Sequence, residues 1–128
     1  MSRNGQGENF AMISSYDAQQ SNLIAAFKAI KTFWREIKTS RGINRRMQFT
    51  EHFRNRQDAP LRFTQMAWAT TRQFGCGVKS CNGNYVVVCR YSPRGNIVGQ
   101  NIYNVGSTCS QCAGGCTNEG PHKGLCIV

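Results

Sequence analysis

The chain has 128 residues and carries 16 Lys and Arg against 6 Asp and Glu, a formal net charge of +10. This length predicts one domain with a single core. No apolar run approaches the ~18 residues of a membrane span, which excludes a transmembrane segment. The residues after Met1 contain no apolar segment of a secretory signal peptide.

The first predicted element is a helix between Asp17 and Ile37. Its apolar residues recur at steps of three and four, a helical stripe that comprises Leu23, Phe27, Ile30, Trp34 and Ile37. Asp17 followed by Gln20 resembles a capping box, and Gly42 provides a stop signal. From Arg41 to Pro60 the pattern breaks, which predicts a loop with one helical turn.

A second, shorter helix is predicted from Phe63 to Thr71, followed by a β-hairpin. The β-rich runs 75–80 and 85–91 flank Asn82-Gly83, the strongest short hairpin signal. Residues 97–105 form a candidate further extended segment. From Gly106 the chain is small, polar and rich in cysteine, so we expect it to need crosslinks.

The cysteines indicate an oxidising compartment. Seven are present, and six of them lie in the range from Cys81 to Cys126. This density in a small chain is typical of extracellular disulfide frameworks. Six can pair, which leaves one free, joined to another chain, or without its natural partner. A competing interpretation is a tail zinc site, because Cys109, Cys112, His122 and Cys126 have zinc-ligand spacing.

Two long segments resemble motifs of one known family. Residues 61–70 read LRFTQMAWAT, and residues 87–96 read VVCRYSPRGN. Together with Gly7-Glu8-Asn9 they resemble the CAP superfamily of cysteine-rich secretory proteins, venom allergens and plant pathogenesis-related proteins. The wording is similar to secreted venom-allergen-like proteins of roundworms.

The resemblance implies an α+β fold, a three-layer α-β-α sandwich of CAP type whose first helix is missing from this chain. It divides the chain into a partial CAP domain (1–105) and a cysteine-rich hinge (106–128). In the family a first helix and further cysteines precede the Gly-Glu-Asn segment, so we interpret the chain as truncated at its amino terminus and expect one sheet face to be uncovered and apolar. By resemblance Cys76 pairs with Cys89, and Cys81 is the candidate for the unpaired cysteine. The remaining disulfide cysteines are Cys109, Cys112, Cys116 and Cys126, in a connectivity that stays open.

The family's cavity holds two histidines and two glutamates that can share a divalent cation. The match carries over Glu8 and Glu36, whereas one histidine position lies upstream of Met1 and the other corresponds to Arg62. Since arginine stays protonated and has no lone pair, we expect neither a metal nor another cofactor here. One hypothesis is that Arg62 bridges both glutamates. The alternative is that Arg62 is solvated and the glutamates only cap helices.

Two further groups of residues are candidates for binding. Phe49 and Phe53 are candidate contacts for a sterol or fatty acid, which some family members bind, or ordinary anchors of the loop. An arginine patch would dock anionic partners such as sulfated glycans, or it is a solvated basic face; it comprises Arg41, Arg45, Arg46, Arg54 and Arg56. No nucleic-acid-binding motif is present, so we expect no nucleic-acid partner.

The sequence favours a protein without catalytic activity. Its two histidines, His52 and His122, belong to no motif that pairs a nucleophile with a base. His52 lies in the basic loop, where an exposed histidine is more common than a metal ligand. We therefore predict a secreted, extracellular binding protein, a host-interaction or immunomodulatory effector that contacts a host protein or a lipid. The alternatives are a divalent-metal-dependent hydrolase, a polyanion-binding module, and a degenerate chain that forms no stable fold.

Overall fold

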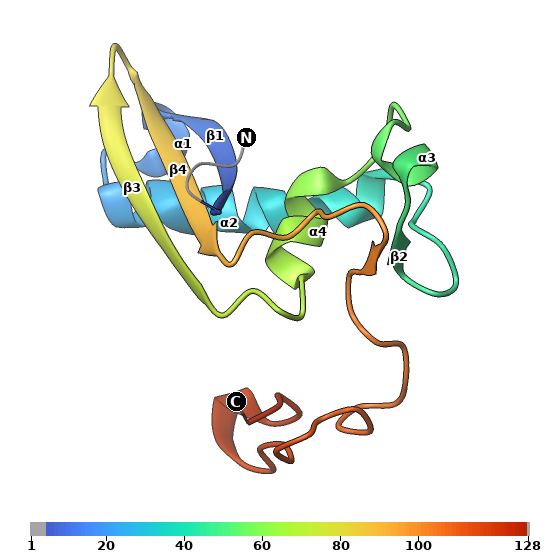
Figure 1. Cartoon of the computed structure of the whole chain (residues 1–128). Coiled ribbons are helices and arrows are strands. Elements are labelled where there is room, and N and C mark those ends of the chain that lie inside the picture. Colours follow the sequence, from blue (N-terminus) through green and yellow to red (C-terminus); the bar gives the residue numbers. More distant parts are fainter. Residues whose placement is uncertain (1–4, 128) are drawn as a thin grey trace.

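The computed structural model describes residues 5–127; residues 1–4 and 128, including the start of the predicted CAP domain and the last residue of the predicted hinge, lie outside the described part. A three-stranded antiparallel sheet forms one half of the body (Figure 1). Its strand order is β1 (Gly7–Ser14), β4 (Asn84–Ser92), β3 (Gln73–Cys81). The sequence patterns predicted β3 and β4, but not β1.

The β3–β4 hairpin turns at the predicted dipeptide. Asn82 and Gly83 have φ angles of 45° and 84°, the left-handed backbone that a type I′ turn requires. The register places Cys76 opposite Cys89. On the other side of β4, β1 pairs Glu8 with Arg90.

The main helix begins later than predicted. Ser14 caps the short helix α1 (Ser15–Ala18), and its hydroxyl accepts from the backbone N–H of Asp17. Gln19 and Gln20 then take left-handed backbone angles, and Ser21 caps α2 (Asn22–Thr39). The predicted start at Asp17 is therefore wrong, because this residue belongs to the helix before.

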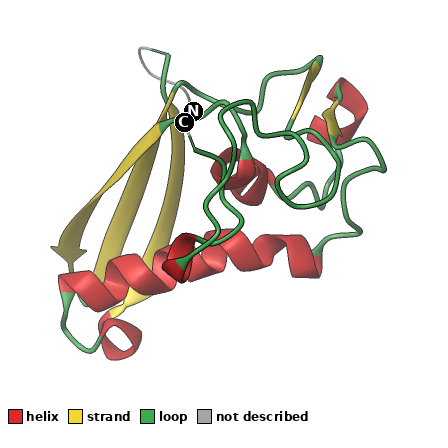
Figure 2. Cartoon of the chain, turned by 90° about the horizontal axis from the view of Figure 1, so that it is seen from below, coloured by secondary structure: helices red, strands yellow, loops and turns green. Residues whose placement is uncertain are grey.

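Helix α2 runs across one face of the sheet (Figure 2). Only a narrow stripe of its residues is buried against the strands. Ala25, Ala29 and Phe33 are fully buried there and pack with the strand residues Val87 and Cys89. The stripe recognised in the sequence lies mainly outside this contact, since Leu23 is 80% exposed and Phe27 60% exposed. Small alanines let the helix approach the sheet closely, which explains why the larger residues lie elsewhere.

The other sheet face carries exposed apolar side chains. Phe10 is 48% exposed and Met12 is 58% exposed, whereas the alternating residues Asn9 and Ile13 lie on the opposite face of the strand and are buried. The resemblance stated from the sequence implied such an uncovered apolar face.

A second core lies beyond the C-terminal end of α2 (Figure 1). It joins β2 (Gln48–Phe49) and β5 (Gln100–Asn101), which pair with each other, to α3 (Glu51–Arg54) and α4 (Leu61–Ala67). Phe49, Phe53, Trp68 and Ile102 are buried in it. Helix α3 confirms the predicted turn in the loop, whereas residues 97–105 contain only the two-residue strand β5.

Residues 106–127 wind below the body in Figure 1 and include the short 3₁₀ helix η1 (Gly120–His122). Together these elements confirm the predicted α+β class. In the described part of the chain, no helix is both long and apolar enough to cross a membrane.

Candidate functional site

The segments recognised in the sequence meet where helix α4 begins. Asn9 of β1 donates one amide hydrogen to the carbonyl of Arg62 and another to the hydroxyl of Tyr91, both at 3.1 Å. Asn96 donates to the carbonyl of Leu61 at 2.9 Å and accepts from the hydroxyl of Thr64 at 2.6 Å. Burial raises the pKa of Tyr91, although the hydrogen bond from Asn9 partly opposes this.

Glu36 of α2 acts as the cap of α4. This helix follows Pro60, which supplies no side-chain cap, so its first N–H groups need another acceptor. Glu36 Oε1 accepts from the backbone N–H of Arg62 at 2.9 Å and of Phe63 at 3.4 Å. Its Oε2 accepts from Nη1 of Arg62 at 2.9 Å. Both carboxylate oxygens of Glu36 are thus engaged.

Glu8 has a different partner. Its Oε2 lies 3.4 Å from Nε of Arg90, the residue that faces it on β4. The expected bridge therefore forms only on one side, because Arg62 contacts Glu36 and not Glu8. Arg90 could not be predicted from the sequence, since this pairing depends on β1, which the sequence pattern did not reveal.

Glu8 and Arg62 nevertheless line the same cavity. It measures about 430 Å³, and its other lining residues are Asn9, Phe10, Ala59, Leu61 and Asn96. The Arg62 side chain is 51% exposed and reaches solvent beside Glu36. The cavity thus presents a carboxylate and a guanidinium, each already partnered within the protein.

This arrangement does not fit a divalent metal ion. Glu36 has both oxygens in hydrogen bonds, Glu8 is paired with Arg90, and Arg62 cannot ligate. Across residues 5–127, no group of three or more His, Cys, Asp or Glu has metal-binding geometry. His52, the candidate substitute, lies in another hollow, beside Arg45 and Phe53.

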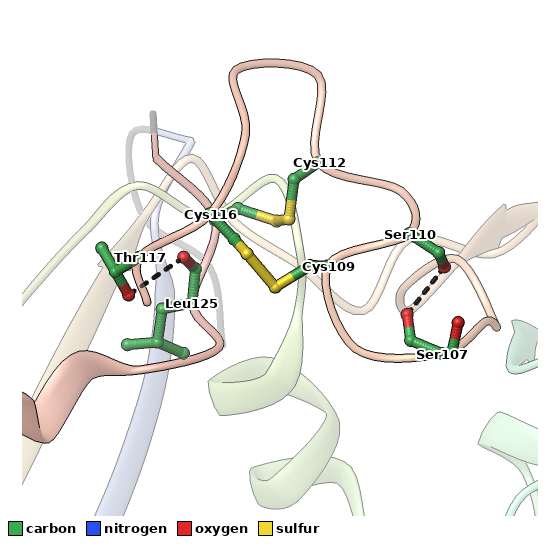
Figure 3. The surroundings of a disulfide bond; sticks show 8 residues. Ser107, Cys109, Ser110, Cys112, Cys116, Thr117 and Leu125 are labelled. Carbon is green, nitrogen blue, oxygen red and sulfur yellow. Dashed lines mark hydrogen bonds between the residues drawn. A yellow bond between two sulfur atoms is a disulfide. The ribbon is translucent and has the colours of Figure 1, made fainter. Parts of the chain in front are cut away.

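The tail cysteines form disulfides. Cys109 bonds to Cys116 and Cys112 to Cys126 (Figure 3). The zinc interpretation of the tail is therefore wrong for its three proposed cysteine ligands. The side chain of His122 lies outside the described residues. Near the same loops, the hydroxyl of Ser110 donates to the carbonyl of Ser107 at 2.7 Å.

The hairpin disulfide and the unpaired cysteine are as expected. Cys76 and Cys89 are bonded across the hairpin, and Cys81 is the free cysteine of the described part. The three disulfides together confirm the cysteine-rich, crosslinked character inferred from the composition.

Phe49 and Phe53 are core residues. Phe49 is fully buried, and Phe53 is 2% exposed. Their rings pack edge to face at 5.5 Å, and Phe49 meets Trp68 in the same way at 5.6 Å. The expectation that these rings contact a lipid is corrected, because a ligand would first have to displace the second core.

The arginine patch divides into paired and unpaired members. Arg41 and Arg56 share the carboxylate of Asp58, and Arg54 lies 3.9 Å from Glu51. Arg56 is also stacked over the ring of Phe53 at 5.2 Å. Arg45 and Arg46 are exposed, and neither has a carboxylate partner among residues 5–127.

Fold and site together define a small disulfide-crosslinked α+β domain with carboxylates around one helix start. The model of the cysteine-rich secretory protein family (CAP) matches residues 2–91. This chain belongs to that family.

The comparisons with individual proteins agree with this family membership. The chain is 38% identical over 125 residues to Ancylostoma secreted protein of Ancylostoma caninum, covering 97% of this chain and 28% of that relative. It is 41% identical over 68 residues to a cysteine-rich venom protein of Tityus serrulatus, covering 50% of this chain and 17% of the relative. The crystal structure of NaASP2 with Zn²⁺ superimposes with a TM-score of 0.79 at 32% identity, covering 98% of this chain and 61% of that one. The chain thus spans less than two thirds of each.

Proposed function

We propose that this chain is a secreted, extracellular protein that acts by binding, without catalytic activity of its own. The observation that carries the proposal is the position of Arg62, whose guanidinium and backbone N–H both donate hydrogen bonds to the carboxylate of Glu36. A hydrolase that uses a metal ion would need free ligands here, and the carboxylates of this cavity are already partnered. The names of the relatives, which describe secreted and venom proteins, support secretion.

The partner we propose is a molecule of the host, such as a host protein, and the alternative ligand is a sterol or fatty acid. The lipid alternative no longer has Phe49 and Phe53 as contacts, because both are buried. A more apolar hollow of about 530 Å³ lies between the body and the tail, beside Ala69, Ala113 and Ile127. We also keep the division of the chain near residue 105, which the two disulfides closed within the tail support.

A zinc titration tests the proposal. The oxidised chain is titrated with Zn²⁺ in a calorimeter and is assayed for hydrolysis of ester and peptide substrates with and without zinc. We expect no hydrolysis, and no stoichiometric zinc binding that depends on Glu36. Arg62→His supplies a ligand and frees Oε2 of Glu36, so we expect it to gain weak zinc binding that Glu36→Gln removes. Zinc-dependent hydrolysis by the unmodified chain that is lost in Glu36→Gln would overturn the proposal.

A further inference from the structure

Arg45 and Arg46 stand at the tip of a well-ordered loop. The side chain of Asn44 donates to the carbonyl of Gln48 at 2.8 Å and accepts from its backbone N–H at 2.9 Å. The backbone N–H of Met47 donates to the carbonyl of Asn44 at 3.2 Å. Three hydrogen bonds therefore close the turn that carries the two arginines, and their backbone positions are set before any ligand binds.

The turn is also fixed to the rest of the protein. The carbonyl of Met47 accepts from the backbone N–H of Ile102 at 2.7 Å, and Phe49 directly after the turn is fully buried. At the base of the loop, Asp58 accepts from the backbone N–H of Arg41 at 2.9 Å and also pairs with Arg56. The nearby acid Asp58 is thus occupied by other arginines, which leaves the charges at the tip unneutralised.

A hollow lies on each side of this arginine pair. The first measures about 350 Å³ and is lined by Arg45 and Arg46 with Gln48, Thr50 and His52 among others. The second measures about 570 Å³, and here the same two arginines are joined by amide side chains, those of Gln48, Asn101, Asn104 and Gln111. Gln111 comes from the tail, so body and tail both contribute. No Asp or Glu is among the described residues that line either hollow.

This chemistry suits a chain that bears several anionic groups. Guanidinium groups bind sulfate and carboxylate groups through paired hydrogen bonds, and amides hydrogen-bond to hydroxyl and sulfate oxygens. Two hollows that share one arginine pair can hold successive anionic units of a polymer. The formal net charge of +10 attracts such a polymer from a distance. The amide-rich second hollow matches the hydroxyl groups of a sugar better than it matches a lipid surface.

We propose that Arg45 and Arg46, with the two hollows beside them, form a binding site for a sulfated polysaccharide. The site is separate from the cavity at Glu8 and Arg62. It names a partner class for the binding role proposed above and therefore rests on that role.

Binding of the full oxidised chain to heparin oligosaccharides, at a salt concentration of about 0.15 M, tests the site. We expect Arg45→Ala/Arg46→Ala to weaken binding roughly 10-fold or more, since charge-assisted hydrogen bonds are lost. Arg35→Ala/Lys38→Ala is the matched control, because both residues are exposed on α2 and the net charge falls equally. The control should lose less than about 3-fold, as expected for screened long-range charges. Circular dichroism and thermal unfolding establish that each variant is folded.

Two further variants test the geometry. Arg45→Lys/Arg46→Lys retains charge but not the paired hydrogen bonds, so its affinity should lie between those of the unmodified chain and the alanine variant. Gln111→Glu places a negative charge in the second hollow and should weaken binding, whereas Gln111→Ala should weaken it less.

The proposal fails if the two double-alanine variants lose affinity equally, because the binding would then be a diffuse effect of charge. It also fails if chemically desulfated heparin binds as well as heparin, if anionic lipid vesicles bind in preference, or if no binding is measured. None of these outcomes bears on zinc-dependent hydrolysis, so failure of this site is distinguishable from failure of the proposed function.

Discussion

Single residues hold the three family motifs together, and Gln65 is the clearest case. Its side chain is 2% exposed, accepts from the backbone N–H of Gly95 at 3.0 Å and donates to the hydroxyl of Thr71 at 3.3 Å. Gly7 lies so close to Gln65 that a Cβ atom there would overlap the amide. The glycines of these motifs therefore make room for their neighbours.

Gly95→Ala tests this close packing. A Cβ at this position would lie 2.6 Å from Cγ of Trp68, and the buried indole has little room to move. We expect the free energy of unfolding to fall by roughly 1–3 kcal/mol, as for other overpacked sites. Chemical denaturation measures the change. Gly77→Ala is the control, because nothing lies within 4 Å of its Cβ position; equal stability of the two variants would contradict the interpretation.

Among the elements, the two ends of the segment between α2 and α4 are joined by one carboxylate. Asp58 accepts from the backbone N–H of Arg41, and the side chains of Arg41 and Arg56 pair with it. These hydrogen bonds, with the backbone one the largest, lower the pKa of Asp58 from 3.8 to about 2.

This lowered pKa predicts a dependence of stability on pH. The folded state holds the proton of Asp58 more weakly than the unfolded state does, so the contribution of Asp58 is complete above its unfolded pKa of 3.8. It is lost as the pH falls from there toward about 2. Asp58→Asn should therefore lower the stability near neutral pH and flatten its fall in this acid range. Denaturant unfolding at a series of pH values measures both effects, with Glu119→Gln in the exposed tail as control. Parallel pH profiles for Asp58→Asn and the unmodified chain would refute the prediction.

The elements also show what the sequence could reveal. The hairpin was predictable because Asn82-Gly83 sets its turn locally. The start of α2 was not predictable, since Asp17 and Ser21 are both residue types that commonly cap a helix. Only the left-handed backbone at Gln19 and Gln20 separates α1, which contains Asp17, from α2, which Ser21 caps. Strand β1 was missed because its identity depends on pairing with β4, whose paired residues lie 70 or more positions away in the chain.

The same distinction applies to the candidate site. The family resemblance implied the positions of Glu36 and Arg62 in one cavity, and their side chains are in contact. The partner of Glu8 did not follow, because the pairing of Glu8 with Arg90 arises from strand register. The positive charge of the arginine patch was predictable from the composition. Only the fold distinguishes Arg45 and Arg46 from Arg41 and Arg56, which pair with Asp58.

In the whole molecule, two apolar cores support the body, whereas the tail has none. Phe33 and Val87 lie fully buried in the first core, and Phe49 and Ile102 in the second. Across 106–127, by contrast, no residue whose side chain is described is buried. The tail conformation therefore depends on its two disulfides and a few backbone hydrogen bonds, such as that from Thr117 to the carbonyl of Leu125 at 2.9 Å.

This difference predicts that reduction unfolds the tail before the body. Without its crosslinks the tail regains chain entropy, and none of its described side chains is buried to oppose unfolding, so a protease should cut it between residues 106 and 127. The body also loses the disulfide of Cys76 and Cys89, yet its two cores remain to oppose unfolding. Limited proteolysis with mass spectrometry, with and without reductant, locates the cuts.

Cys112→Ser/Cys126→Ser makes the test specific to the tail. It opens one tail crosslink and leaves the hairpin disulfide intact, so we expect cleavage in the tail without reductant and a resistant fragment that ends near residue 105. First cuts within β3 or β4, or a tail that stays resistant after reduction, would show that the tail and the body are stabilised as one unit. The same digestion tests whether the domain boundary lies near residue 105, because a protease-resistant body requires that its own cores suffice.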